Sequence, residues 1–428
     1  MKKLLFLLML MTVVLLFAAC SGFSDTTTGL VQPQTSVSDA AKDTAETVVT
    51  TPETAPETAP ETVSSLALSI DGQPLADYTI VYADSLYDPE VLSPFTTEHD
   101  FFRLIAEDLA KRLYAKTGVL LPCVRDTEIA VGKWEILVGP TNRSESDPLD
   151  ALDVFKTYVK LSGKKLVVGA GYDSTPYTGN KRQSYCYAST YHAWDAVEDY
   201  LDKTMAEGIS SLSLTADSDF SVKVDLIAVA CIGDSITEGA GSTARDFHAY
   251  PAVLGRILWQ DHLVVNLGNS GKTMRDDLGM HYRGTTQHAA LRRYAPMYDY
   301  AFLMLGTNDS YYDRTWPASS DEKYLTSADN LVKELTFNNT AVEVIVMNCP
   351  MYYGTNGSGS AKVRALQAKL PSRFEAMGIK SSFFDMYTFT KEKVGAVNFP
   401  DQLHPNDTGH AMMAEELSTL LLQRDDGT

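Results

Sequence analysis

The sequence predicts an α/β protein in which a three-layer, flavodoxin-like α/β/α domain with a parallel five-stranded sheet follows a smaller α/β domain. In residues 224–428, near-continuous apolar runs alternate with segments of helical periodicity, as in a parallel sheet covered on both faces. Strand-like and helical segments also alternate in residues 66–223. The chain has 428 residues, 44% of them hydrophobic and 21% charged, which is typical of globular proteins with two or three domains.

The first residues are typical of a secretory signal peptide. Lys2 and Lys3 precede an apolar run, Leu4–Ala19, that is short for a membrane span of roughly 20 residues. The run ends in Phe17-Ala18-Ala19-Cys20, which resembles the lipobox of bacterial lipoproteins, although Phe17 stands where that pattern usually has Leu. The resemblance implies that residues 1–20 are a lipoprotein signal peptide and that a lipid on Cys20 anchors the protein to the outer side of the bacterial cell membrane. The alternative is an ordinary secretory signal with an incidental cysteine.

Residues 21–65 are predicted to be a disordered tether. They are rich in Thr, Pro and Glu, with a Pro-Glu-Thr-Ala repeat in 52–62, and contain too few large apolar side chains to offset the entropy lost on ordering. A flexible coil of this length spans roughly 35 to 40 Å. A passive spacer without a length requirement is the alternative.

The composition also excludes some classes of partner. The formal net charge is −19 and no basic footprint is visible, which argues against nucleic-acid binding. No dinucleotide or Walker A fingerprint occurs, so no cofactor is expected. The remaining cysteines are widely spaced without a CxxC pair and are predicted to be free, buried thiols. They are Cys123, Cys186, Cys231 and Cys349.

The block 66–223 is predicted to be an accessory α/β domain. Its helix over 98–116 places Phe102, Ile105 and Leu109 on one apolar face. The segment 135–143 resembles part of the small α/β domains that precede catalytic barrels in some secreted glycoside hydrolases. No nucleophile paired with a base stands out in this block. The other expected elements are a strand and turn over 66–81, a strand over 135–138, a hairpin over 158–168 and a helix over 191–205.

The block 224–428 supplies the five expected parallel strands and their crossover helices. The strands are placed at 226–231, 263–266, 300–305, 342–348 and 382–386. The helices are placed at 250–259, 285–294, 322–337, 361–377 and 407–421. Pro371 is expected to kink or split the fourth helix. In such sheets, chemistry takes place at the carboxyl ends of the strands.

Polar motifs follow four of these strands. They are Gly233-Asp234-Ser235-Ile236-Thr237-Glu238-Gly239, Asn266-Leu267-Gly268-Asn269-Ser270-Gly271, Gly306-Thr307-Asn308-Asp309 and Asp401-Gln402-Leu403-His404-Pro405. In content and order they resemble the four blocks of the SGNH, or GDSL, hydrolase family, and the resemblance covers nearly all of the second block. It implies that residues 224–428 are the catalytic domain of a serine ester hydrolase.

The residue types fit ester hydrolysis. Ser235 is the expected nucleophile, His404 the base that takes its proton, and Asp401 the group that orients the imidazole. The backbone N–H groups of Ser235 and Gly271 and the side-chain amide of Asn308 are the expected oxyanion donors. Each has an alternative as a cap, turn or loop residue, which the ordered set of motifs argues against. Turn or cap chemistry is the preferred interpretation for Asp309, which is left out of the site.

A metal site is not expected. Asp401, His404, Asp407 and His410 are spaced by three like ligands on a helix, but Pro405 disfavours helix at His404. His410 is therefore predicted to be a packed helix residue. The absence of a GxSxG elbow counts against an α/β-hydrolase lipase.

The substrate is predicted from less specific features. Loop aromatics near the strand ends could stack on sugar rings, Tyr311 and Tyr312 above all, or pack between loops. Tethering, an acidic surface and the accessory domain favour an acyl ester, chiefly acetyl, on a polysaccharide or smaller carbohydrate. The alternatives are a lysophospholipase or thioesterase and, from another class, a non-catalytic glycan-binding surface lipoprotein. The other loop aromatics are Trp316, Tyr352 and Tyr353.

Overall fold

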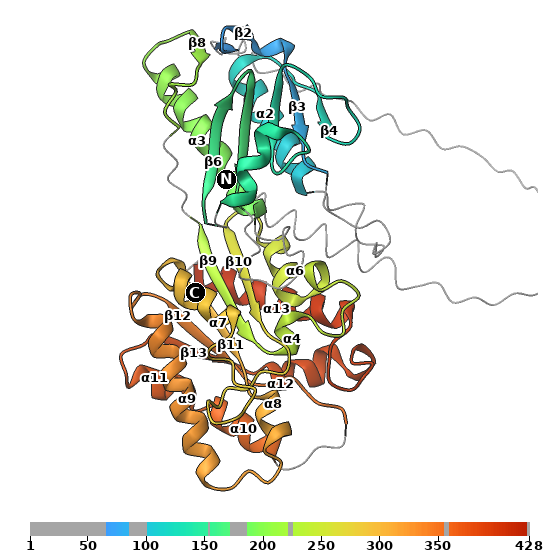
Figure 1. Cartoon of the computed structure of the whole chain (residues 1–428), viewed down its shortest axis with the longest axis vertical. Coiled ribbons are helices and arrows are strands. Elements are labelled where there is room, and N and C mark those ends of the chain that lie inside the picture. Colours follow the sequence, from blue (N-terminus) through green and yellow to red (C-terminus); the bar gives the residue numbers. More distant parts are fainter. Residues whose placement is uncertain are drawn as a thin grey trace, which may run out of the picture. The chain divides into compact units, whose positions relative to one another are not determined.

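The computed structural model describes residues 66–84, 101–152, 155–171, 186–220, 226–354 and 359–425 (Figure 1). The signal peptide, the tether and Cys20 lie outside these residues, as does the expected helix start at Glu98. Both α/β regions belong to one compact unit, Val63–Thr428, so the domain boundary at residue 224 falls within it and remains a prediction. No helix in the described ranges is both long and apolar enough to cross a bilayer.

The first region contains a five-stranded sheet of order β4-β3-β5-β7-β6, in which only β6 is antiparallel to its neighbour. A second, three-stranded sheet has the order β2-β1-β8. The predicted strand over 135–138, the hairpin and both helices are confirmed, whereas the short strands β4 and β8 were not expected. The elements are β1 (Ala67–Ile70), β2 (Gln73–Pro74), β3 (Thr79–Tyr82), α2 (Phe101–Thr117), β4 (Cys123–Arg125), β5 (Glu135–Val138), β6 (Thr157–Ser162), β7 (Lys165–Ala170), α3 (Cys186–Ala206) and β8 (Ser211–Leu214).

The distinctive segment 135–143 has a packing role in this region. Glu135 and Arg143 are both buried, and the guanidinium of Arg143 lies 3.2 Å from the Glu135 carboxylate and also donates to the Asp126 carbonyl at 2.8 Å. Gly139 has φ 76°, and a Cβ there would lie 2.4 Å from the ring of Phe102. A buried charge is tolerated when it is paired and hydrogen-bonded, so this segment ties β5 to the loops around it.

The second region contains a wholly parallel sheet of order β10-β9-β11-β12-β13, the 2-1-3-4-5 order of flavodoxin-like folds. All five predicted strands and the predicted fold class are confirmed. The strands are β9 (Ile227–Gly233), β10 (His262–Gly268), β11 (Tyr300–Met304), β12 (Glu343–Met347) and β13 (Ser381–Phe384). The helices are α4 (Ser235–Glu238), α5 (Arg245–His248), α6 (Tyr250–Ile257), α7 (Thr286–Tyr294), α8 (Thr307–Tyr312), α9 (Ser319–Thr336), α10 (Gly359–Gln367), α11 (Leu370–Glu375), α12 (Met386–Phe389) and α13 (Asp407–Asp425).

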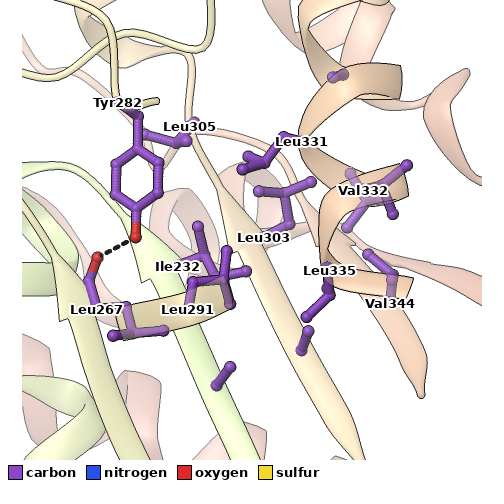
Figure 2. Close-up of a cluster of buried hydrophobic side chains, with 14 of the residues drawn as sticks. Ile232, Leu267, Tyr282, Leu291, Leu303, Leu305, Leu331, Val332, Leu335 and Val344 are labelled. Carbon is purple, nitrogen blue, oxygen red and sulfur yellow. Dashed lines mark hydrogen bonds between the residues drawn. The ribbon is translucent and has the colours of Figure 1, made fainter. Parts of the chain in front are cut away.

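Two apolar clusters, one on each face of this sheet, make the three layers. On one face, Ile232 of β9 and Leu303 of β11 pack with side chains of α7 and α9 (Figure 2), and residues of α11 join the same cluster. On the other face, Cys231 and Phe302 pack with side chains of α6 and α13. Adjacent residues of β9 and β11 therefore enter opposite clusters, which explains why these strands appear in the sequence as continuous apolar runs.

Several local expectations are refined. Pro371 splits the fourth predicted helix, since it occupies the first turn of α11 after α10 has ended. The short helices α4, α5, α8 and α12 were not predicted. Cys231 and Cys349 are buried free thiols, and burial raises the pKa of Cys349 to about 12. Cys123 is only partly buried, which corrects its prediction as a buried thiol, and the side chain of Cys186 lies outside the described residues.

Candidate active site

The candidate site lies where the strand order reverses. β9 has β10 on one side and β11 on the other, so the connections leaving β9 and β11 diverge at their carboxyl ends. Open α/β sheets bind their ligands at this switch point. Ser235 follows β9 and Asn308 follows β11, each in the first turn of a short helix, α4 and α8.

Ser235 is presented by a tight turn between β9 and α4. Asp234, not Ser235, caps α4, because its carboxylate accepts a hydrogen bond from the backbone N–H of Ile236 at 3.1 Å. The alternative of Ser235 as a helix cap is therefore wrong. Gly233 is required by space, since a Cβ there would lie 2.0 Å from Oγ1 of Thr237. Asp234 is fully buried, and burial raises its pKa to about 6.

The structure brings Ser235, His404 and Asp401 into one chain of hydrogen bonds. Ser235 Oγ lies 2.9 Å from His404 Nε2, and His404 Nδ1 lies 2.6 Å from Asp401 Oδ2. Asp401 Oδ1 also accepts from the backbone N–H groups of Leu403 and His404, at 2.9 and 2.6 Å. Burial alone would raise the pKa of Asp401, but these hydrogen bonds outweigh it and lower the pKa below its usual value. Asp401 is thus an ionised acceptor that holds the proton of His404 on Nδ1.

The loop that carries His404 is packed against the loop after α4. A Cβ at Gly241 would lie 2.4 Å from the Pro405 carbonyl and 2.8 Å from Cβ of His404. The backbone N–H of Thr243 donates to Asp407 at 2.8 Å, at the start of α13. These contacts hold the loop of His404 against the turn that carries Ser235.

A second contact holds the same loop from the other side. Gln402 adopts φ 70°, an uncommon conformation for a residue with a side chain, and its carbonyl accepts from the backbone N–H of Tyr353 at 2.9 Å. Tyr353 follows β12, so the position of His404 also depends on that strand's loop.

The expected oxyanion donors Gly271 and Asn308 lie on two loops that are bonded together. Gly271 has φ 75°, which favours glycine. The side-chain amide of Asn308 donates to the Lys272 carbonyl at 3.0 Å, and an amide has a second N–H that this contact leaves free to donate. Ser235, Gly271 and Asn308 thus follow the ends of three neighbouring strands, β9, β10 and β11.

The site predicted from the sequence left out two carboxylates near these residues, Asp309 and Glu238. Asp309 is fully buried, and it accepts from the backbone N–H groups of Met274 and Arg275 at 2.8 and 2.9 Å. Burial raises its pKa to about 7. Glu238 accepts from the backbone N–H of Ser270 at 2.8 Å. The interpretation of Asp309 as a turn or cap residue is wrong, because its carboxylate reaches a different loop.

The four residues of the rejected metal site divide among different contacts, since Asp401 bonds to His404, Asp407 to Thr243 and His410 to Tyr250. His410 is fully buried in α13, as predicted, where its Nδ1 accepts from the backbone N–H of Tyr250 at 3.3 Å. Burial lowers the pKa of His410 to about 4. In the part of the chain that the structure describes, no three His, Cys, Asp or Glu side chains are grouped so that they could hold a metal ion.

The loop aromatics divide into exposed and packed side chains. Tyr311 and Tyr312 on α8 are 60% and 47% exposed, and their rings meet edge to face at 5.4 Å. Trp316 is buried and donates to Asp321 at 2.7 Å, so of its two alternatives the structure supports packing. Tyr353 donates to the Thr390 carbonyl at 3.0 Å. The two α8 tyrosines are the exposed aromatics adjacent in sequence to Asn308.

Comparison with known proteins gives one family and one curated relative. Residues 231–412 match the model of the GDSL-like Lipase/Acylhydrolase family, and this range contains all four motifs. The match confirms the family resemblance drawn from those motifs. An acetylxylan esterase of Xylanibacter ruminicola is 31% identical over 144 residues, which cover 32% of this chain and 28% of the esterase. The chain thus spans little more than a quarter of the length of that relative.

Solved structures are also similar to this chain over nearly half of its length. A family two carbohydrate esterase from Clostridium thermocellum, in complex with cellohexaose, is 19% identical with a TM-score of 0.35, covering 48% of this chain and 67% of that one. A carbohydrate acetylesterase family member from Sinorhizobium meliloti is 19% identical with a TM-score of 0.36, covering 46% and 97%. An aryl esterase from M. smegmatis is 20% identical with a TM-score of 0.35, covering 46% and 99%.

Proposed function

We propose, from the premise that residues 231–412 form a domain of the GDSL-like lipase/acylhydrolase family, that this chain is a serine esterase with Ser235 as its nucleophile. The observation that carries the proposal is the chain of hydrogen bonds from Ser235 through His404 to Asp401, at 2.9 and 2.6 Å. A nucleophile, a base and an orienting group within hydrogen-bond reach are the signature of covalent acyl transfer.

In the first half of the reaction, Ser235 Oγ attacks the ester carbonyl while its proton passes to Nε2 of His404. The carbonyl oxygen becomes an oxyanion, which accepts hydrogen bonds from the backbone N–H groups of Ser235 and Gly271 and from the Asn308 amide. The tetrahedral intermediate then expels the alkoxide, which takes the proton from His404 and leaves as an alcohol. Ser235 retains the acyl group as an ester.

In the second half, water attacks the acyl ester of Ser235 and His404 accepts the proton of this water. Collapse of the second tetrahedral intermediate releases the carboxylic acid and returns the proton to Ser235 Oγ. Asp401 stays ionised throughout, since its role is to keep the other imidazole proton on Nδ1 and to stabilise the imidazolium. The lowered pKa of Asp401 suits this role.

We further propose that the substrate is an acetyl ester on a carbohydrate. The curated relative is an acetylxylan esterase, and the exposed rings of Tyr311 and Tyr312 follow Asn308 on α8. Exposed aromatic rings can stack on the faces of sugar rings.

The experiment is to incubate the purified protein with acetylated xylo-oligosaccharides and measure the acetate released, beside acetyl, butyryl and octanoyl esters of one alcohol. We expect acetate release and a kcat/KM that is highest for the acetyl ester. In a site that gains from a buried acyl chain, each methylene contributes roughly 0.8 kcal/mol. A steady rise in kcat/KM from the acetyl to the octanoyl ester would therefore contradict the carbohydrate proposal and indicate a lipid substrate.

For location, we propose that a lipid on Cys20 holds the protein at the outer side of the cell membrane, as the sequence Phe17-Ala18-Ala19-Cys20 suggests. Cells that express the full chain and incorporate labelled palmitate would carry the label on the wild-type protein and not on Cys20→Ala. Unlabelled wild-type protein, released into the medium, would instead indicate an ordinary signal peptide.

A further inference from the structure

The loop that carries Gly271 has little regular structure of its own. We call residues Gly268–Arg275 the oxyanion loop. It leaves the end of β10 and contains only an isolated bridge at Thr273. A backbone donor contributes to catalysis only if it stays within a fraction of an ångström of the position where the oxyanion forms. The contacts that fix this loop are therefore a part of the catalytic design.

The first half of the oxyanion loop is held by α4. Glu238 lies one helical turn after Ser235, and its carboxylate accepts from the backbone N–H of Ser270 at 2.8 Å and from the Ser270 hydroxyl. Its other oxygen lies 3.0 Å from Arg245. The glycine at 268 permits this approach, since a Cβ there would lie 2.1 Å from the backbone nitrogen of Glu238. The helix of the nucleophile thus fixes the residue next to Gly271.

The second half is held by α8. Asp309 accepts from the backbone N–H groups of Met274 and Arg275, and its neighbour Asn308 donates to the Lys272 carbonyl. The helix that supplies the amide donor thus bonds to three backbone positions of the oxyanion loop.

The free energy that it costs to bury the Asp309 carboxylate indicates that this residue has a specific role. Its side chain is fully buried, and burial raises its pKa to about 7. A buried carboxylate costs free energy that hydrogen bonds only partly offset, and a neutral side chain would avoid that cost. A carboxylate has the advantage that both of its oxygens accept, so it can hold two adjacent N–H groups at once.

We propose that Glu238 and Asp309 are positioning residues that clamp the oxyanion loop between α4 and α8, so that Gly271 and Asn308 face the same carbonyl oxygen. The inference rests on the proposed esterase function. Both carboxylates bond to the backbone of the loop, Glu238 to Ser270 and the fully buried Asp309 to Met274 and Arg275. They act on the transition state through the donors that they hold in place.

The test compares Asp309→Asn and Glu238→Gln with the control Asp277→Asn. The Asp277 carboxylate pairs with the Arg275 side chain at 2.8 Å, so its change removes a charge at the same loop without touching the clamp. The measurements are kcat and KM for a small acetyl ester, the affinity of an arylboronic acid that forms a tetrahedral adduct with Ser235, and the thermal midpoint of unfolding.

We expect kcat of Asp309→Asn to fall by roughly 10- to 100-fold, somewhat less than the 10² to 10³ that follows direct loss of an oxyanion donor. KM should stay within about threefold, because the loss falls on the transition state. Boronate affinity should fall in parallel with kcat, since the adduct needs the same donors. Glu238→Gln should show a smaller effect in the same direction, and Asp277→Asn none.

Unchanged kcat and boronate affinity in folded Asp309→Asn would overturn the inference, as would a lower thermal midpoint with unchanged turnover per active site. If Asp309→Asn does not fold, an unchanged kcat in Glu238→Gln would overturn the inference instead. A wild-type protein without esterase activity would refute the proposed function itself. An active wild type with unaffected variants refutes only the clamp.

Discussion

The hydroxyl oxygen of Ser235 lies 2.9 Å from Nε2 of His404, although the two residues are 169 positions apart in the chain. Ser235 begins α4, and His404 lies in the loop that precedes α13. The close approach of Gly241 to Pro405 packs these two loops against each other. The fold itself therefore places the hydroxyl and the imidazole within hydrogen-bond distance.

Ser235→Ala should abolish ester hydrolysis and leave the fold intact. The change removes the atom that forms the acyl ester, so turnover of a short acyl ester should fall by at least about 10⁴. Only one small polar group is lost, and the thermal midpoint should move by no more than a few degrees. Retained turnover in the variant would show that another residue is the nucleophile.

Asp401→Asn should lower kcat by roughly 10³ to 10⁴ with little change in KM, because an amide no longer selects the Nδ1-protonated imidazole. Hydrogen bonds lower the pKa of the Asp401 carboxyl, so the wild type keeps an ionised acceptor that the amide cannot replace. A variant as active as the wild type would place the orienting group elsewhere.

His410 should make the protein sensitive to acid. Its pKa is lowered to about 4 by burial, whereas a histidine in the unfolded chain titrates near 6.5. Between these pH values the imidazole binds a proton in the unfolded state but not in the folded state. The free energy of unfolding therefore decreases as the pH falls from about 6.5 towards 4. The loss from this residue is at most about 3 kcal/mol.

The measurement for His410 is the urea midpoint of the wild type and of His410→Gln from pH 7.5 to pH 4.5. Glutamine can still accept from Tyr250 and donate to the Ala240 carbonyl, but it does not titrate. We expect a shallower pH dependence in the variant. Identical slopes would assign the acid sensitivity to other groups.

Exhaustive dialysis against a strong chelator should leave esterase activity unchanged, since the proposed mechanism uses only Ser235, His404, Asp401 and amide donors. The initial rate before and after dialysis is the measurement. Activity that is lost and then restored by a divalent cation would revive a metal site near His404.

Replacing Tyr311 and Tyr312 together by Ala should reduce kcat/KM for acetylated oligosaccharides more than for a small acetyl ester, which has no sugar to stack. Loss of a stacking ring costs up to about 1.5 kcal/mol, or roughly tenfold. Phe337→Ala is the matched control, because Phe337 is 81% exposed and follows α9, outside the proposed site. An equal loss on both substrates would assign the tyrosines a structural role.

The sequence predicts this sheet and the grouping of its motifs well, for a physical reason. Strands such as β9 and β11 are buried on both faces and must be apolar throughout, which makes them visible as runs. Because the carboxyl ends of parallel strands meet at one edge, Ser235 and Asn308 could be placed together before any coordinates.

The sequence does not reveal contacts between a side chain and a backbone segment that is far away in the chain. Asp309 acts on Met274 and Arg275, and no local pattern reveals that these N–H groups need an acceptor. Trp316 follows a strand end like the exposed tyrosines, yet it packs in the core, because sequence position alone does not fix burial. The short strand β4 has neither the length nor the apolar run that would mark it.

The two glycines under the site restrict how this protein could be engineered. A Cβ at Gly233 would lie 2.0 Å from Thr237, and one at Gly268 would lie 2.1 Å from Glu238. Any substitution of these glycines would displace those neighbours, so neither position is suitable for a mutant library. Met280 is a different case, since its terminal methyl lies 3.7 Å from where a Cβ on Gly271 would stand and the side chain is 39% exposed. If the proposed esterase function holds, directed evolution of acyl-chain preference should therefore begin by randomising Met280, where a smaller side chain makes room beside Gly271.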